Sequence, residues 1–135
     1  MREIYKEIEI SLNEAQQKFR LRRMDAFSGI CILRLLLRLE EVKPNPDILD
    51  LIASLSNEEL LSVFNVCMEH TQIVMPAGEC DVMKNGLWLT PDIQHETKVC
   101  MRLMIAAISW NLNGFFGGGG SNSTPASPTI SQPDA

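Results

Sequence analysis

Apolar and polar positions alternate in two separate runs at the start of the chain. Residues 5–12 alternate between apolar and mainly acidic side chains, and residues 18–23 place Phe19 and Leu21 between basic residues. A period of two is typical of β-strands. The pattern fits a β-hairpin over residues 4–23, with an acidic strand face beside a basic one.

The same segment also fits a helix. Ser11 and Glu14 have the spacing of a capping box, and Leu12, Ala15 and Phe19 recur at helical intervals. Taken alone, the residues leave hairpin and helix equally open.

Helix start signals precede four apolar runs further along the chain. They are Asp25, Asn45 with Pro46, Ser56 with Glu59 three residues later, and Thr90 with Pro91. Capping side chains and proline in the first turn favour helix initiation. The predicted helices cover residues 26–42, 46–54, 57–70 and 91–112.

The first of these helices is apolar on almost every side, because seven Ile and Leu residues lie between positions 30 and 39. Such a helix is usually central. We therefore expect Leu33 and Leu37 to be core residues, with a cost of about 2–5 kcal/mol for truncation of either to alanine.

Residues 71–89 carry turn chemistry at Pro76-Ala77-Gly78 and Asn85-Gly86, flanked by runs that fit short strands. Residues 117–135 are too rich in Gly, Ser and Pro to form a core, a composition typical of disorder. The predicted fold is α+β but mainly α-helical, an N-terminal β-hairpin followed by a small helical bundle. One globular domain covers residues 1–116, and a flexible tail covers residues 117–135.

Composition narrows the classes of function. The 135 residues are 45% hydrophobic and 21% charged, with a net charge of −5. An acidic balance argues against nucleic-acid binding, and the basic run from Lys18 to Arg23 is short and flanked by acidic residues. The sequence shows no long apolar run and no secretory signal, so we expect a cytoplasmic protein with reduced cysteines.

The candidate metal ligands, called the metal-like residues below, are Cys67, His70, Cys80 and His95, with Cys100 nearby. Four such ligands suit tetrahedral zinc, but their irregular spacing favours ordinary buried cysteines. The Cys67 and His70 pair lacks an orienting third group for nucleophilic catalysis. We expect no enzyme activity, no cofactor and no metal needed for folding.

The last predicted helix runs into two adjacent aromatic residues and then four glycines. Trp110, Leu112, Phe115 and Phe116 are the candidate partner-binding residues, because aromatic side chains anchor interfaces. The alternative is that Phe115 and Phe116 fold back onto the core and end the helix. The sequence leaves this choice open.

The order of these features resembles the tail assembly chaperones of long-tailed bacteriophages. The similar segments are KFRLRRMDAFSG with the leucine-rich run after it, NEELLSVFNVCMEHT, and the ending WNLNGFFGG, which matches an Asn-x-x-x-Phe-Phe pattern before a small-residue tail. The resemblance covers roughly residues 5–118 and favours the hairpin at the N-terminus. It does not explain the four cysteines.

The resemblance implies a non-enzymatic viral protein of the host cytoplasm, with the tape-measure protein as partner and the tail-tube protein as a second. Such chaperones keep the tape-measure protein soluble during tail assembly. Two other hypotheses stay open. One is a small helical adaptor that dimerises through the last helix and binds a host protein, and the other is a zinc-stabilised regulator.

Overall fold

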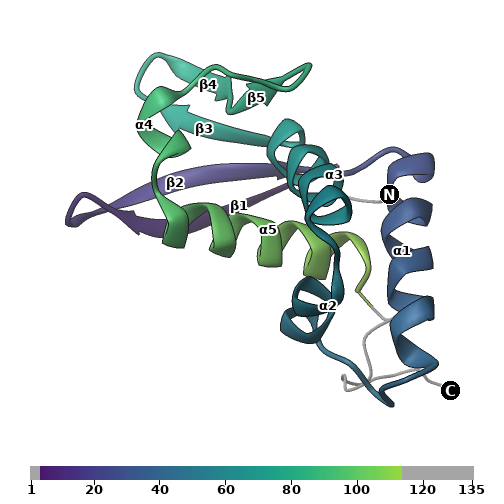
Figure 1. The fold of residues 1–135 in the computed structure, drawn as a ribbon. Coiled ribbons are helices and arrows are strands. Elements are labelled where there is room, and N and C mark those ends of the chain that lie inside the picture. The colour runs from purple at the N-terminus through teal and green to yellow at the C-terminus, as the bar shows by residue number, and fades with distance from the viewer. Residues whose placement is uncertain (1–3, 114–135) are drawn as a thin grey trace, which may run out of the picture.

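The computed structural model describes residues 4–113, and its first element is a β-hairpin (Figure 1). β1 (Tyr5–Leu12) pairs antiparallel with β2 (Ala15–Arg22) over eight positions. The two residues between them, Asn13 and Glu14, have φ angles of 52° and 65°. Two consecutive left-handed residues form a type I′ turn, whose twist matches that of the paired strands. The predicted hairpin is confirmed.

The helical alternative for residues 12–23 is wrong, because their backbone hydrogen bonds are made between paired strands instead of within a helix. Ser11, the candidate helix cap, lies inside β1. The acidic and basic strand faces meet as expected: Glu7 lies opposite Arg20, and the Lys18 Nζ atom is 3.9 Å from a Glu7 carboxylate oxygen.

Two later strands extend the hairpin into a four-stranded antiparallel sheet of order β1-β2-β3-β4. β3 (Thr71–Met75) lies beside β2, with Ile73 opposite Phe19, and β4 (Gly78–Asp81) pairs with β3. Both Ile73 and Phe19 are buried. The inner face of the sheet is therefore a wall of the hydrophobic core.

A separate small sheet follows. β5 (Met83–Lys84) pairs with β6 (Leu87–Trp88), and Asn85 and Gly86 between them have φ angles of 54° and 78°. The predicted turn at Asn85-Gly86 is confirmed, since this dipeptide tolerates positive φ.

The helices of the described chain begin after the hairpin. They are α1 (Ala26–Glu40), α2 (Ile48–Ser54), α3 (Asn57–Glu69), α4 (Pro91–Gln94) and α5 (Thr97–Asn111). The predicted caps of α1 and α3 are confirmed. The Asp25 carboxylate accepts the Ser28 N–H at 3.1 Å, and Ser56 and Glu59 form a complete capping box.

α2 starts later than predicted. Asn45 does not cap it but turns the chain with a φ angle of 51°, and Pro46 is buried before the helix begins. The cap is Asp47, whose carboxylate accepts the Asp50 N–H at 2.8 Å while the Asp50 carboxylate accepts the Asp47 N–H at 3.0 Å. A reciprocal pair of bonds satisfies two backbone donors at once.

The single helix predicted for residues 91–112 is also wrong. The chain turns after α4, where the Ile93 carbonyl accepts the Glu96 N–H at 3.0 Å and the Cys100 thiol at 3.3 Å. Thr90 makes no side-chain cap bond to α4, although Pro91 occupies the first turn as expected. The start signal at Pro91 therefore opens a short helix, and α5 begins separately at Thr97.

The expected small helical bundle is not formed. The described residues are 49% helix and 26% strand, and the sheet makes up one layer of the domain. α5 lies along the sheet and packs against α3 (Figure 1). The prediction was wrong because the pairing of Phe19 with Ile73 joins positions far apart in the sequence. Within residues 4–113, no helix has the length and apolar character needed to span a membrane.

α1 is a peripheral helix, not the predicted central one, and stands at the edge of the molecule (Figure 1). Its buried face consists of Ile32, Leu36 and Leu39. Leu33 is half-buried and Leu37 is 52% exposed. Leu33 packs against the core, so the expectation of two core residues is wrong for Leu37, because the second apolar face of this helix has no covering layer among the described residues.

Candidate partner-binding groove

An open apolar groove lies between α3 and α5, with a volume of about 440 Å³. Its lining residues recur at helical spacing on both sides: Asn57, Leu60, Leu61 and Phe64 from α3, Gln94 before the turn, and Thr97, Cys100, Met101 and Met104 from α5. Cys100 and Met104 are buried core residues that also border the groove, whereas Leu61 and Met101 are exposed beside it. The groove is thus a consequence of helices whose apolar faces are wider than the core requires.

The floor of the groove is fixed by aromatic packing. Phe64 is half-buried, and its ring centroid lies 5.9 Å from that of Trp88, with the rings tilted by 52°. Tilted aromatic pairs at this separation are favourable beyond their buried area. The contact holds β6 against α3, so the apolar floor exists before any partner binds.

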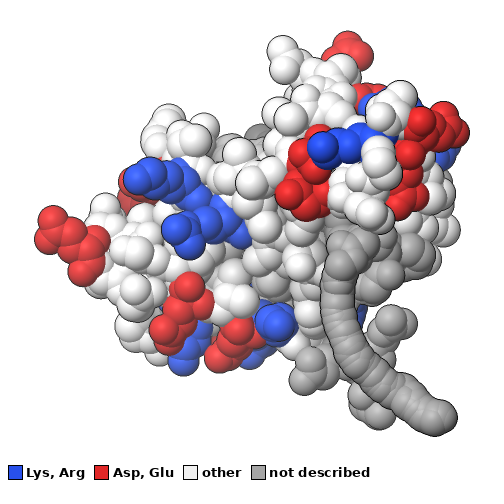
Figure 2. Space-filling model, turned by 90° about the horizontal axis from the view of Figure 1, so that it is seen from below, with Lys and Arg blue, Asp and Glu red and all other residues white. Residues whose placement is uncertain are grey.

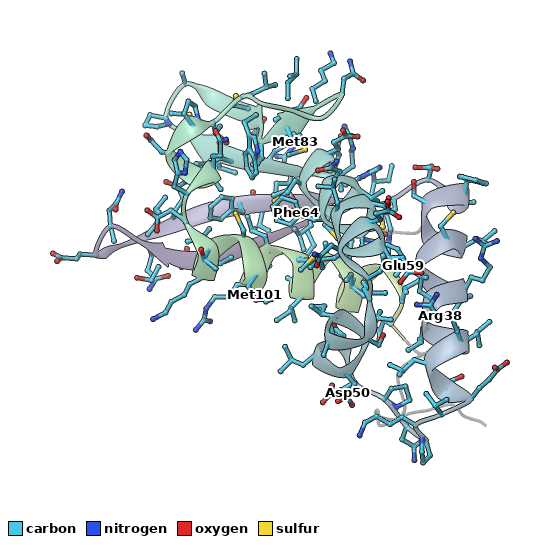
Figure 3. All side chains as sticks on the ribbon, in the orientation of Figure 1. Arg38, Asp50, Glu59, Phe64, Met83 and Met101 are labelled. Atoms are coloured by element: carbon cyan, nitrogen blue, oxygen red, sulfur yellow. The ribbon has the colours of Figure 1, made fainter. Side chains whose placement is uncertain are left out.

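The rim of the groove is more adaptable. Leu61 is 61% exposed and Met101 is 37% exposed. In Figure 3, Phe64 and Met101 mark the two helices that border the groove. Methionine has three rotatable bonds and a polarizable sulfur, so it can adjust to apolar groups of different shape. Together, rim and floor suit an apolar segment of a partner protein.

An ion pair orients the N-terminal end of α3, which supplies Asn57 and Leu60 to this groove. Arg38 of α1 contacts both carboxylate oxygens of Glu59, at 2.6 and 2.9 Å (Figure 3). The hydrogen bonds from Arg38, together with that from the Ser56 N–H, lower the pKa of Glu59 to about 2. Glu59 therefore joins α1 to the capping box of α3.

The end of α5 is anchored to the segment before α1. The Arg23 guanidinium lies 4.0 Å above the Trp110 ring and donates to the Trp110 carbonyl at 3.0 Å. The Asn111 side chain accepts the Met24 N–H at 2.9 Å and donates to the Ala107 carbonyl at 2.9 Å. These contacts hold the end of the helix beside the segment that joins β2 to α1.

Among the predicted partner-binding residues, Leu112 is buried at 5% exposure and belongs to the core, so its assignment to a surface is corrected. Trp110 is half-buried beneath Arg23. Phe115 and Phe116 lie outside the described residues. Of the two members of this set that the structure describes, Trp110 reaches the surface and Leu112 does not.

The metal-like residues do not converge. Cys67 is fully buried, Cys80 is half-buried on β4, and His95 is exposed after α4. His70 lies with Nδ1 2.7 Å from the Val66 carbonyl oxygen. Within residues 4–113, no group of three or more His, Cys, Asp or Glu side chains is placed to hold a metal ion.

The two most buried cysteines are held as thiols. Burial raises the pKa of Cys67 to about 12, and burial together with the nearby Glu96 raises the pKa of Cys100. The reactive form of cysteine is the thiolate. The arrangement therefore does not activate Cys67 as a nucleophile beside His70.

The basic run on β2 is paired within the sheet. Arg20 lies 3.4 Å from a Glu79 carboxylate oxygen, and its guanidinium is 4.8 Å from the centroid of the Tyr5 ring. Figure 2 likewise shows basic and acidic groups next to one another on the face that it draws. Such interspersed charges do not form the single-sign surface that phosphate binding requires.

The buried face of α5 bears on the hypothesis of an adaptor that dimerises through the last helix. Val99, Leu103, Ala107 and Ile108 are all buried inside their own domain. The same side chains are therefore not available for a helix pair between two copies in this conformation.

The groove was not predicted from the sequence. Met104 is buried in the core and also borders the groove, whereas Leu61 and Met101 are exposed at its rim. The available signal was the width of these apolar faces, which exceeds one stripe on each helix. The sequence does not show that α3 and α5 leave those extra stripes side by side.

Comparison of the chain with models of known protein families, with curated proteins and with solved structures finds no match.

Proposed function

We propose that this chain is a tail assembly chaperone of a long-tailed bacteriophage. It binds the tape-measure protein in the host cytoplasm and keeps it soluble until tail-tube subunits assemble around it. The support from sequence is the resemblance carried by KFRLRRMDAFSG, NEELLSVFNVCMEHT and WNLNGFFGG. The support from structure is the apolar groove between α3 and α5.

The groove is the single observation on which this proposal depends. A chaperone of this kind covers exposed apolar segments and then releases them, so it needs apolar contact without deep enclosure. Each leucine-sized side chain that leaves water contributes about 1.5–3 kcal/mol, and the loss of rotational and translational freedom offsets several such contacts. A groove with the adaptable rim residues Leu61 and Met101 gives binding that is reversible.

The C-terminal aromatic residues add a second contact in this proposal. Trp110, near the end of α5, and the neighbouring pair Phe115 and Phe116 also bind the tape-measure protein. The net charge of −5 limits association between copies of the chaperone, because like charges repel one another. The alternative, in which Phe115 and Phe116 cover their own domain, is tested by alanine replacement of both. A lower melting temperature with unchanged solubilisation of the partner would support the alternative.

The experiment is co-expression with the tape-measure protein of the same phage, with the soluble fraction of that protein as readout. We expect Leu61→Asp to abolish solubilisation, because it places a charge on the rim of the groove. The matched control is Leu49→Asp on α2, a leucine with 58% exposure compared with 61% for Leu61. Both variants should keep the melting temperature of the isolated domain, since exposed substitutions change stability by about 0.5 kcal/mol or less.

Two results would contradict the proposal. Solubilisation that survives Leu61→Asp would mean that the groove does not bind the partner. Equal loss with Leu61→Asp and Leu49→Asp would mean that added charge, not the groove, is responsible.

A further inference from the structure

β1 forms an open edge of the four-stranded sheet, on the side away from β3 and β4 (Figure 1). It is eight residues long, whereas β4 at the opposite edge has four. Its register with β2 is continuous, and the strand contains no proline, so neither a bulge nor a proline protects this edge. An edge of this kind accepts a further strand.

The register shows which backbone groups of β1 point outward. The Ile4 carbonyl accepts the Arg23 N–H at 2.8 Å, so these two residues form a hydrogen-bonded pair. Hydrogen-bonded and non-hydrogen-bonded pairs alternate along an antiparallel ladder, so the even-numbered residues of β1 direct their N–H and C=O groups to β2. The odd-numbered residues direct theirs to the open side, and all four are exposed: Tyr5, Glu7, Glu9 and Ser11. Within residues 4–113 no strand lies on that side.

A cavity lies on the inner side of the same edge. Its volume is about 310 Å³, and it is lined by Lys6 and Ile8 of β1, by Leu21 of β2 and by the last turns of α5, including Trp110. No residue of β3 or β4 borders it, so it belongs to the β1 side of the sheet. Residues of an added strand opposite Lys6 and Ile8 point to this inner face, because opposed residues share a face. An apolar side chain at such a position fills the cavity.

The outer side of the edge is acidic. Glu9 is exposed and forms no ion pair within residues 4–113. Lys18 lies opposite Glu9 on β2, but its Nζ atom is 3.9 Å from a carboxylate oxygen of Glu7 instead. A strand added to the edge therefore meets an unpaired carboxylate at its centre, and a lysine or arginine opposite Glu9 supplies the counter-charge.

Other occupants within the chain match this edge less well. In two copies paired through β1, odd-numbered residues face odd-numbered ones. The two antiparallel registers that join more than five strand residues set Glu7 opposite Glu9, or Glu9 opposite Glu9. Like charges directly opposite one another are destabilising. Residues 114–135 contain no lysine or arginine, so they bring no cation to Glu9.

We propose that the open edge of β1 binds an extended segment of the tape-measure protein as a fifth strand of the sheet. Alternate residues of that segment are apolar and face the cavity, and a lysine or arginine lies opposite Glu9. A protein that is kept soluble before assembly exposes unpaired backbone groups as well as apolar side chains, and strand addition satisfies both. This inference rests on the proposed function. It adds recognition of the partner's backbone to the apolar contact made by the groove between α3 and α5.

Hydrogen exchange of single amides tests the proposal on the natural chain, with electron-transfer fragmentation and mass spectrometry to resolve neighbouring residues. In the free chain, the N–H groups of Ile8 and Ile10 should be protected, because they bond to β2, and those of Glu7, Glu9 and Ser11 should exchange rapidly. In the complex with the tape-measure protein, exchange at Glu7, Glu9 and Ser11 should slow by at least about tenfold.

Each other pattern of exchange overturns the inference. Unchanged rapid exchange at these three amides in the complex places the tape-measure protein elsewhere. Protection already present in the free chain means that the edge is covered without the partner. A second copy covers it if that protection increases with protein concentration, and the chain itself, residues 114–135 included, covers it if the protection does not.

Two pairs of variants separate the backbone contact from the charge. Ser11→Pro removes an outward N–H and leaves the bonds to β2, whereas Ser11→Ala keeps that N–H, so we expect only Ser11→Pro to weaken binding of the tape-measure protein, by about tenfold. Glu9→Lys should weaken binding by about tenfold. Its control for net charge is Glu40→Lys, at an exposed position at the end of α1. Equal effects within either pair contradict the role assigned to that group.

The same measurements distinguish failure of this inference from failure of the proposed function. If Leu61→Asp abolishes solubilisation while the outward amides of β1 stay unprotected in the complex, the proposed function stands and this inference fails. If the chain forms no complex with the tape-measure protein, both fail.

Discussion

Two adjacent leucines on α1 should differ in how much their replacement by alanine lowers the stability of the domain. Leu36 is 1% exposed and packs against the core, whereas Leu37 is 52% exposed on the outward face. The change Leu→Ala removes the same atoms at both positions and raises helix propensity equally. A difference between the two variants therefore reports burial alone, with Leu37→Ala as the matched control for Leu36→Ala.

The expected magnitudes follow from this burial. Leu36→Ala should lower the free energy of unfolding by about 2–5 kcal/mol, because it removes buried methyl groups and leaves a cavity. A domain of this size loses about 4 °C of Tm per kcal/mol, so the Tm should fall by roughly 8–20 °C. Leu37→Ala should change the free energy of unfolding by about 0.5 kcal/mol or less.

The assay is thermal and urea unfolding of both variants, followed by circular dichroism at 222 nm and at one protein concentration. Equal destabilisation by the two changes would refute the placement of α1, because it would mean that the outward face is covered in solution. A repeat at several protein concentrations would then show whether a second copy covers it.

Two further predictions concern ionisation. The pKa of Glu59 falls from 4.5 to about 2 on folding, chiefly through its hydrogen bonds with Arg38, so its stabilising contribution is complete above pH 4.5 and is lost as the pH falls towards 2. The difference in stability between the natural chain and Glu59→Gln should therefore shrink over this interval in urea titrations, and a constant difference would contradict the assignment. Burial raises the pKa of Cys67 to about 12, so at pH 8 its alkylation by iodoacetamide should require unfolding. Mass spectrometry should show Cys31 and Cys80, which are both half-buried, modified before Cys67 in the folded protein, and early modification of Cys67 would show that its environment is open.

Features that depend on neighbouring residues were predictable from the sequence. The Asp25 cap needs a bond that spans three positions, and the Ser56–Glu59 capping box needs two such bonds. The Asn85-Gly86 turn needs only two residues that tolerate positive φ. Sequence patterns record such interactions because both partners lie within one helical turn or one tight turn.

The helix boundaries could not be predicted from neighbouring residues alone. Asn45 and Asp47 are both acceptable caps, and the chain uses Asp47 because Pro46 is buried before the helix. Pro91 opens a helix as expected, but the turn after Gln94 depends on the Ile93 carbonyl and its bonds to Glu96 and Cys100. Start signals locate a helix, whereas tertiary contacts decide where it begins and ends.

The candidate sites depended on tertiary structure still more strongly. Leu112 has the same apolar character as Leu61, yet Leu112 is buried and Leu61 is exposed beside the groove. Cys67 and His70 are close in sequence, but the metal-like residues beyond them lie apart. Residue type indicates which chemistry a side chain can perform, and only its position in the fold shows whether partners for that chemistry are present.

By itself, the sequence determined the caps of α1 and α3 and the apolar character of most of the surface of α1, and it left the N-terminal segment open between hairpin and helix. Only the tertiary structure decided that β3 joins β2 in one sheet and that α1 lies at the edge. The physical reason is that strand pairing and burial are interactions between residues distant in sequence. A helix that is apolar on every side satisfies its pattern equally well in a core or at an interface, so its surroundings decide which one it occupies.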